Sequence, residues 1–189
     1  MPRWDAQAEQ RLRTAAIELF LELGYENVTV AQIAERAGLT RRTFSRYFAD
    51  KRDVLFAGSD RLPDLLAEAL SRVDPEVTPF DAVVTALADV GATLGLRTAP
   101  HAAQRREVIA RSPELQERGR TKFAAVAHAL FIELVQRGSD PATAALLADV
   151  GVAVFQSGFN RWVEDPAGSD LAACLQEAGA ELAVAITQH

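Results

Sequence analysis

Residues 29–48 decide the fold, and they read TVAQIAERAGLTRRTFSRYF. Thr29 with Gln32 three positions later is a capping-box pattern, which predicts the start of a short helix. A second short helix follows the glycine, so the stretch has the form of two helices joined by a tight turn. Such a pair needs a small residue where the helices cross and a residue that tolerates positive φ in the turn. Ala34 and Gly38 meet these two needs, so the stretch predicts a helix-turn-helix.

The residues before this stretch predict a further helix. Apolar side chains recur there at the spacing of one helical face, and Gly24 can end the helix. These side chains are Leu12, Ala16, Leu19, Phe20 and Leu23. In the helix-turn-helix itself, Ile33, Leu39 and Phe44 are expected to fill the wedge between the two helices. The N-terminal part of the chain therefore predicts a compact unit of three helices.

Longer helices are expected in the rest of the chain, and no segment alternates with period two for long enough to predict a strand. Asp50 can cap a fourth helix that runs at least to Arg61, and Pro63 is expected to kink or break it. The longer helices are expected at residues 79–97, 100–111, 113–137, 141–164 and 170–187. The sequence predicts an all-α fold with two domains, a helix-turn-helix domain at residues 1–52 and a larger helical domain at residues 53–189.

The composition is that of a soluble globular protein. The 189 residues carry 26 acidic and 20 basic side chains, for a net charge of −6, and contain one cysteine, Cys174. A single cysteine excludes an internal disulfide framework and fits a reducing cytoplasm. No apolar run is expected to reach the length of a membrane span, and the N-terminus lacks the apolar stretch of a signal peptide. We therefore expect a cytoplasmic protein that does not enter a membrane.

Positive charge is concentrated in one place. Residues 38–53 hold five basic side chains against two acidic ones, whereas residues 1–50 as a whole carry seven of each. A protein that binds nucleic acid needs basic charge only where phosphates touch it, so an acidic chain can still bind DNA. Cations on short helices are also typical of an ordinary solvated face, so the charge alone does not decide the function.

The N-terminal residues resemble the DNA-binding domain of the TetR family of transcriptional regulators. The resemblance covers about residues 8–56 and depends on an ordered set of positions. These are Gly24-Tyr25, Val28-Thr29-Val30, Ile33-Ala34, Ala37-Gly38-Leu39-Thr40, Thr43-Phe44, Tyr47-Phe48, Lys51 and Asp53-Val54-Leu55. The resemblance implies a homodimer that binds double-stranded operator DNA, with a helical domain for a small-molecule effector in the rest of the chain. Arg42 and Ser45 depart from the residues frequent in the family, which affects the base preference rather than DNA binding.

The second helix of the motif can enter the major groove with its N-terminal end first. The residues expected to contact DNA are Thr29, Thr40, Arg41, Arg42, Thr43, Ser45, Arg46, Tyr47 and Lys51. An arginine can pair with guanine through two hydrogen bonds, which contributes ~1–3 kcal/mol of discrimination, and Arg41 or Arg42 is favoured for this role. Arg46 suits a base or a phosphate, while Tyr47 and Lys51 suit phosphates. Thr29 suits a phosphate as well, because free backbone N–H groups follow it in the first turn of a helix.

The larger domain is expected to form the dimer and to bind the effector. Small residues are frequent in the last two helices and permit close helix approach, so these helices are expected to meet those of a second subunit. The residues expected to line an effector pocket are Leu87, Leu94, Ile109, Phe123, Phe131 and Phe159. Each of them is also typical of an ordinary core. Residues 42–48 and 53–56 are similar to regulators with acyl-CoA-like ligands, which favours an apolar, acyl or acyl-CoA-like effector and, by the family's habit, a repressor.

Two other functions are weighed against this interpretation. An enzyme is disfavoured because His101, His128 and His189 lack the spacing of metal ligands and no glycine-rich phosphate loop occurs. For the same reasons we expect no metal and no cofactor. The other alternative is a helical ligand-binding or adaptor protein that has lost DNA binding, and the cationic face of the motif argues against it.

Overall fold

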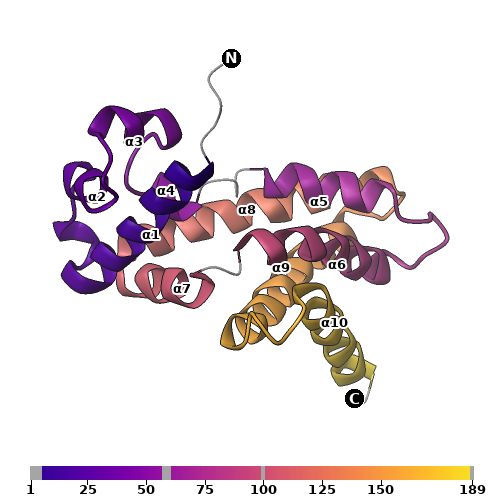
Figure 1. The fold of residues 1–189 in the computed structure, drawn as a ribbon. Coiled ribbons are helices and arrows are strands. Elements are labelled where there is room, and N and C mark those ends of the chain that lie inside the picture. Colours follow the sequence, from indigo (N-terminus) through magenta and orange to yellow (C-terminus); the bar gives the residue numbers. More distant parts are fainter. Residues whose placement is uncertain (1–5, 57–60, 99–100, 188–189) are drawn as a thin grey trace. The chain divides into compact units, whose positions relative to one another are not determined.

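The computed structural model describes residues 6–56, 61–98 and 101–187, and in these ranges it contains helices and no strand (Figure 1). The prediction of an all-α fold is confirmed. In chain order the elements are α1 (Ala6–Leu23), the 3-10 helix η1 (Tyr25–Asn27), α2 (Val30–Arg36), α3 (Arg41–Tyr47), α4 (Asp53–Phe56), α5 (Leu62–Ser71), α6 (Pro79–Thr98), α7 (Ala102–Arg111), α8 (Pro113–Gln136), α9 (Pro141–Glu164) and α10 (Leu171–Thr187).

The fourth helix is expected to reach Arg61, and residues 57–60 of that stretch lie outside the described residues. Asp50 caps the next turn as predicted, because its Oδ1 accepts a hydrogen bond from the backbone N–H of Asp53 at 2.9 Å. In the described part of the chain α4 covers Asp53–Phe56, and Arg61 stands just before α5 as its N-cap. Pro63 lies in the first turn of α5. A proline needs no N–H partner there, so it helps to begin a helix rather than kinking one.

The chain forms two compact units. Unit 1 contains residues 1–60 and 103–119, and unit 2 contains residues 61–102 and 120–189. The division expected from the sequence, at residue 52, follows the order of the chain, whereas unit 1 also takes a segment from the middle of the chain. Helix α8 contributes its beginning to unit 1 and its remainder to unit 2.

Unit 1 closes its core around α1. The apolar face predicted for this helix is buried, apart from Leu23, which is 45% exposed at the helix end. Val108 of α7 and Leu115 of α8 are buried in the same core. Burial of these two apolar side chains removes them from water, which accounts for the presence of residues 103–119 in unit 1.

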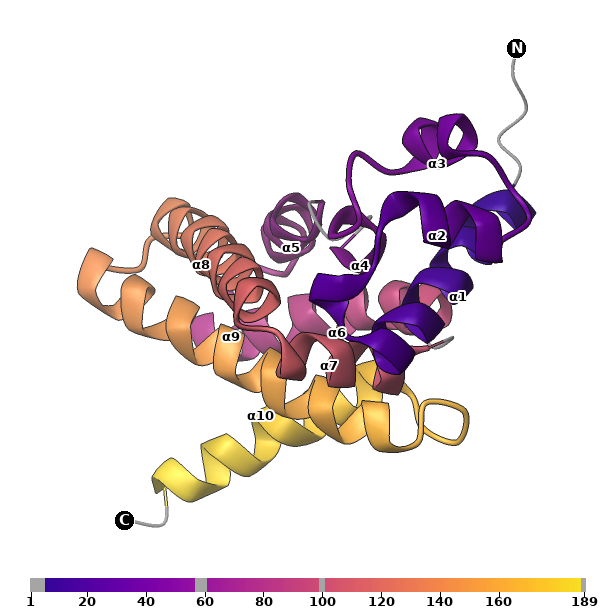
Figure 2. The ribbon, with the colours of Figure 1, turned by 90° about the vertical axis from the view of Figure 1, so that its left-hand side faces the viewer.

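Unit 2 packs α5, α6, α9, α10 and the later part of α8 around a second core, and Figure 2 shows α10 lying against α9. Glycines let its helices meet closely. A Cβ at Gly158 of α9 would lie 2.8 Å from the Cys174 carbonyl oxygen and 2.9 Å from Leu175 Cα. One at Gly91 of α6 would lie 2.6 Å from Leu175 Cδ1. The backbone of α10 therefore approaches α9 at a distance that only glycine permits.

Helix α9 is long and apolar enough to cross a membrane by length and composition, so the expectation that no apolar run reaches this length does not hold for it. Several of its residues, among them Phe155 and Trp162, are buried in unit 2. The core helix of a soluble protein passes the same test, so length and composition alone do not place α9 in a membrane.

Candidate nucleic-acid interface

The turn between α2 and α3 has the geometry that the sequence predicts. Gly38 has a φ of 64°, in the left-handed region that favours glycine. Its N–H donates to the Glu35 carbonyl oxygen at 2.9 Å, and the N–H of Leu39 donates to the Ala34 carbonyl oxygen at 2.8 Å. This pair of hydrogen bonds is a Schellman motif, which ends α2 sharply and starts the turn.

Apolar side chains fill the angle between α2 and α3. Ile33 and Phe44 are almost completely buried, and Leu39 is partly buried against the same core, as predicted. The Phe48 ring, just beyond α3, lies 5.5 Å from the ring of Phe44. Because this side of α3 is committed to the core, its opposite side is available to a partner outside.

Two threonines cap these helices, so their hydroxyls already have partners. Thr29 and Gln32 form the predicted capping box, in which each side chain binds the other residue's backbone N–H. The Thr40 Oγ1 accepts a hydrogen bond from the Thr43 N–H at 3.1 Å and lies 2.9 Å from the Thr43 Oγ1. A phosphate contact by any of these hydroxyls stays a prediction.

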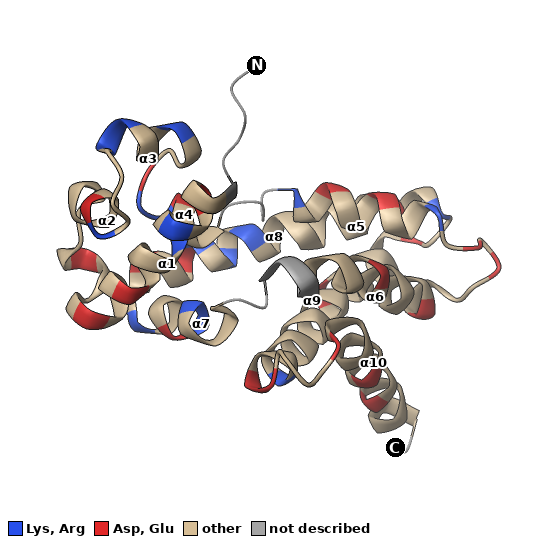
Figure 3. Ribbon diagram, viewed as in Figure 1, with Lys and Arg blue, Asp and Glu red and all other residues tan. Residues whose placement is uncertain are grey.

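The outer side of α3 is cationic, as the blue segments of its ribbon in Figure 3 show. Arg41, Arg42, Ser45 and Arg46 are all exposed. Within the residues that the structure describes, neither Arg41 nor Arg42 has a hydrogen-bond or ion-pair partner. Their guanidinium groups therefore keep all their donors available to base edges or phosphates.

Other arginines of unit 1 are paired. Arg36 lies 2.8 Å from Glu22, and the hydrogen bond between them raises the pKa of Arg36 and lowers that of Glu22. Arg52 lies 2.7 Å from Asp50. The contrast sets the two unpaired arginines of α3 apart from the arginines that hold unit 1 together.

Arg46 and Tyr47 form a pair at the end of α3. Arg46 Nη2 donates a hydrogen bond to the Tyr47 hydroxyl oxygen at 2.9 Å, and the guanidinium lies 4.9 Å from the centre of the Tyr47 ring. Tyr47 is half-buried. The pair places a cation beside a hydroxyl, an arrangement that suits a phosphate oxygen.

Lys51, expected at a phosphate, is directed into unit 1 instead. Its Nζ donates hydrogen bonds to the carbonyl oxygens of Tyr25 at 2.7 Å, Val28 at 3.0 Å and Glu26 at 3.3 Å. It also lies 4.3 Å from the centre of the Tyr25 ring. An ammonium group has three N–H donors, and these carbonyls occupy them all. The geometry therefore favours a structural role for Lys51, as a cap on η1, over the expected contact with DNA.

Replacing Lys51 by methionine keeps the length of the side chain but removes these hydrogen bonds. We expect the free energy of unfolding in urea to fall by about 1–3 kcal/mol, because partly buried carbonyls lose their hydrogen-bond donor. The exposed ion-pair residue Arg72 offers a control, since Arg72→Met should change stability by less than about 1 kcal/mol. Unchanged stability together with weaker DNA binding in Lys51→Met would restore the phosphate role.

Polar contacts that the sequence did not indicate hold the junction after α7 and the start of α8 in unit 1. The Tyr25 hydroxyl donates to Glu114 Oε1 at 3.5 Å, and Arg52 Nη1 lies 3.3 Å from the same oxygen. Burial and the negative charge of Glu114 raise the pKa of the Tyr25 hydroxyl. The Ser112 hydroxyl donates to Glu26 Oε1 at 3.2 Å. These partners are 62 to 89 residues apart, so no local pattern could have paired them.

The residues expected at an effector pocket fall into two groups. Leu87, Leu94, Phe123, Phe131 and Phe159 are buried in, or partly buried against, the core of unit 2. Ile109 packs against the core of unit 1, because α7 belongs to that unit. The structure thus groups Ile109 with a different core from the other five, and contact of all six with an effector stays a prediction.

Aromatic rings form a continuous row on α8 and α9 in unit 2. Phe123 lies 6.0 Å from Phe155, and Phe155 stacks on Phe159 at 5.9 Å with an angle of 11° between the rings. Phe159 in turn lies 5.5 Å from Trp162.

Among the described residues, no group of three or more His, Cys, Asp or Glu side chains is placed to hold a metal ion.

A helix-turn-helix with unpaired arginines on its outer face is typical of a protein that reads DNA. Residues 12–57 match the family described as "Bacterial regulatory proteins, tetR family", and residues 77–187, more than half of the chain, match the "MftR C-terminal domain". The chain belongs to the TetR family of transcriptional regulators. It is a ligand-responsive, DNA-binding regulator, and regulators of this family bind operator DNA and small effectors and act as dimers.

Individual proteins agree with this assignment. The chain is 29% identical to the mycofactocin biosynthesis transcriptional regulator MftR of Mycobacterium tuberculosis over 153 aligned residues. The alignment covers 79% of this chain and 77% of MftR. The solved SmeT–triclosan complex has a TM-score of 0.58 at 20% identity, covering 92% of this chain and 90% of SmeT. FadR from Bacillus subtilis with stearoyl-CoA has a TM-score of 0.57 at 18% identity, covering 90% and 95%. The two structures show the fold alone.

Proposed function

We propose that the protein is a repressor that binds a palindromic operator as a homodimer and leaves it when a small, largely apolar effector binds. The observation that carries the proposal is the pair of exposed arginines on α3, Arg41 and Arg42, which have no partner among the described residues. In a cytoplasmic regulator of this kind no catalysis and no cofactor are needed. An adaptor protein that has lost DNA binding would gain nothing from keeping two arginines free of partners.

In the proposed complex α3 enters the major groove with its N-terminal end first. Arg41 or Arg42 then pairs with guanine, and Arg46 binds a base or a phosphate. Thr43 and Ser45 lie on the same short helix and can reach neighbouring bases. Phosphates are assigned to the Tyr47 hydroxyl beside Arg46 and to the capped helix start at Thr29 and Thr40.

The proposed dimer forms through α9 and α10. Large apolar side chains on these helices stand in solvent, where Leu146 is 65%, Val184 51% and Ile186 66% exposed. Exposed apolar side chains suit a protein interface when they lie together in one patch, and we propose that these do so in the dimer. We propose that a second copy of the chain packs against these side chains, because a palindrome is read by two identical motifs related by a two-fold axis.

A glutamate at Leu146 should oppose this pairing. Leu146→Glu places a charge in each half of the proposed two-fold interface, and we expect self-association to weaken by at least about tenfold. Sedimentation over a range of concentrations measures the shift. Leu23→Glu is the control, because Leu23 is also exposed but lies on α1 of unit 1. A Leu146→Glu dimer as tight as the wild type would contradict the assignment of α9 to the interface.

The proposed effector is apolar, and an acyl or acyl-CoA-like compound is the form we favour. The aromatic row that includes Phe123 and Phe159 can line a site for an acyl chain, together with the expected wall residues Leu87, Leu94 and Phe131. FadR, which shares the fold, was solved with stearoyl-CoA. An effector that binds better to a DNA-incompetent dimer shifts the population away from DNA. We assign the transmission of this shift to α4, which follows the helix-turn-helix along the chain, and to α8, whose first residues belong to unit 1.

The experiment that tests the proposal begins with selection of duplexes from random-sequence DNA by the full-length chain. The dissociation constant for a selected duplex is then measured with and without saturating stearoyl-CoA, and with free stearate and triclosan as further probes. We expect a palindromic duplex whose affinity falls steeply with salt, because phosphate contacts release counterions. Failure to enrich any sequence would refute DNA reading. An affinity unchanged by every probe would refute release by an apolar effector.

A further inference from the structure

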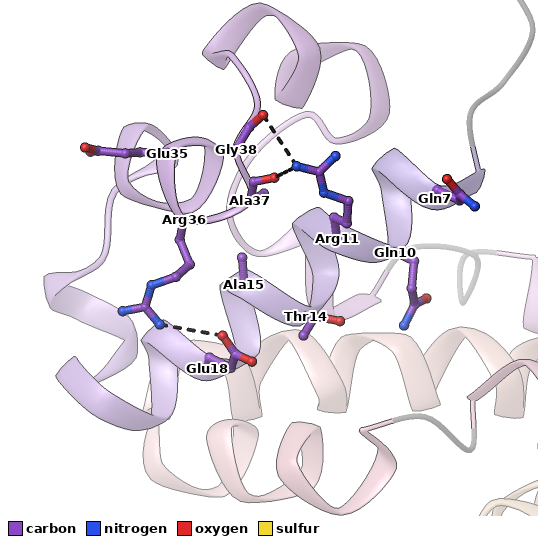
Figure 4. A pocket seen from close by; sticks show the side chains of 10 residues that line it. All are labelled: Gln7, Gln10, Arg11, Thr14, Ala15, Glu18, Glu35, Arg36, Ala37 and Gly38. Carbon is purple, nitrogen blue, oxygen red and sulfur yellow. Dashed lines mark hydrogen bonds and ion pairs between the residues drawn. The ribbon is translucent and has the colours of Figure 1, made fainter.

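Helix α1 holds the turn of the helix-turn-helix through one arginine. The Nη2 of Arg11 donates a hydrogen bond to the Ala37 carbonyl oxygen and lies 3.5 Å from the Gly38 carbonyl oxygen (Figure 4). Figure 4 shows the guanidinium reaching from α1 across a surface groove to these two oxygens. The side chain thus joins α1 to the link between α2 and α3.

The carbonyl oxygens of Ala37 and Gly38 follow the end of α2, where backbone carbonyls lack a helical hydrogen-bond donor. The Schellman hydrogen bonds use the carbonyls of Ala34 and Glu35, and the carbonyls that follow α2 have no helical partner. Within the described ranges, Arg11 supplies the hydrogen bonds that Ala37 and Gly38 accept. Hydrogen bonds from a charged donor are shorter and stronger than those between neutral groups. The Arg11 side chain alone can therefore hold the turn in place.

The identity of the turn residue agrees with this role. A Cβ at Gly38 would lie 2.7 Å from Arg11 Nη2, so glycine is needed for the approach of the guanidinium as well as for the backbone φ. A second contact lies on the same side of α1, where Arg36 of α2 pairs with Glu22 at 2.8 Å and with Glu18 at 3.5 Å. Side chains of helix α1 therefore bind both the end of α2 and the turn that leads into α3.

We propose that Arg11 is a positioning residue for DNA reading. By holding the turn against α1 it sets the direction of α3, and with it the angle at which Arg41 and Arg42 meet base edges. Arg11 itself contacts no DNA in this proposal. The inference rests on the proposed DNA reading by α3. It predicts that loss of Arg11 harms sequence-specific binding more than binding to DNA in general, since paired hydrogen bonds to a base depend on orientation and phosphate attraction does not.

The test uses the full-length chain and a duplex selected by the wild type from random-sequence DNA, with an unselected duplex of the same length for comparison. We expect Arg11→Met to weaken binding to the selected duplex by about tenfold and to the unselected duplex by less than about twofold, with the salt slope unchanged. Arg11→Lys should recover most of the loss, because an ammonium can donate to the same carbonyls. Arg72→Met, which removes an equal charge at the C-cap of α5, should match the wild type on both duplexes.

Three results would overturn the inference. The first is wild-type affinity of Arg11→Met for the selected duplex. The second is an equal loss on both duplexes with a salt slope lower by about one, which would make Arg11 a phosphate contact. The third is a loss for Arg11→Lys as large as for Arg11→Met, if circular dichroism shows both to be folded. A wild type that selects no duplex would refute the proposed function before Arg11 is tested, so the two failures are distinguishable.

Discussion

Simultaneous replacement of Arg41 and Arg42 by methionine should weaken binding to a selected operator by more than about a hundredfold. Each arginine that pairs with guanine contributes ~1–3 kcal/mol of discrimination, and a further part of the affinity comes from attraction to phosphates. Both side chains are exposed and, in the described part of the chain, unpaired. Their loss should therefore leave the free energy of unfolding within about 0.5 kcal/mol of the wild type.

The matched control removes two arginines that do have partners. Arg72 pairs with Glu68 and Arg111 with Glu107 in exposed ion pairs along single helices. The double variant Arg72→Met, Arg111→Met loses the same charge and should bind the operator within about threefold of the wild type. Equal affinities of the two double variants, measured by fluorescence anisotropy at one salt concentration, would show that α3 does not read DNA.

Gly158→Val should lower the free energy of unfolding by about 3 kcal/mol, because it overpacks the contact between α9 and α10. The new Cβ would lie 2.8 Å from the Cys174 carbonyl oxygen and 2.9 Å from Leu175 Cα. Both are backbone atoms, which cannot move aside as the end of a side chain can. The helices must separate, and the buried neighbours then lose contacts. Urea denaturation followed by circular dichroism measures the loss.

The same substitution at Gly119 provides the control. Gly119 is also helical, in α8, but a Cβ there would have no atom within 4 Å. Gly119→Val should change stability by less than about 0.5 kcal/mol, because valine and glycine differ little in helix propensity and nothing is displaced. Similar losses at the two sites would mean that α9 and α10 are not packed as closely as described.

The helix-turn-helix was predictable because its determinants are close together in the sequence. Capping by Thr29 and the positive φ of Gly38 are confirmed, and both depend on backbone chemistry within a few residues. The burial of Ile33 and Phe44 follows from helical periodicity in the same way. Such features need no knowledge of the rest of the chain.

The roles of Lys51 and Arg11 were not predictable by this route. Each carries a long side chain to backbone carbonyls about 25 residues away, and every residue type has a carbonyl, so the partners leave no mark in the sequence. In the sequence, a basic residue that binds such carbonyls cannot be told from one that binds a phosphate. The same limit explains why residues 103–119 were not assigned to unit 1, since Val108 and Leu115 would suit any core.

The effector pocket was the part that the sequence could indicate least. Phe123 and Phe159 pack against other rings of unit 2, as apolar side chains do in any hydrophobic core. A wall residue and a core residue obey the same rule of burial, so only a bound ligand distinguishes them. Expected wall residues therefore stay predictions until an effector is found.

Helix α8 has a consequence for how the protein melts. Its Leu115 completes the core of unit 1, while its Val126, Leu130 and Leu134 belong to the core of unit 2. Each core contains its own stretch of this helix, and adjoining stretches share one ladder of backbone hydrogen bonds. Unfolding that begins in one stretch of α8 therefore propagates along these hydrogen bonds into the other. We expect heating to unfold both cores in a single calorimetric transition rather than two.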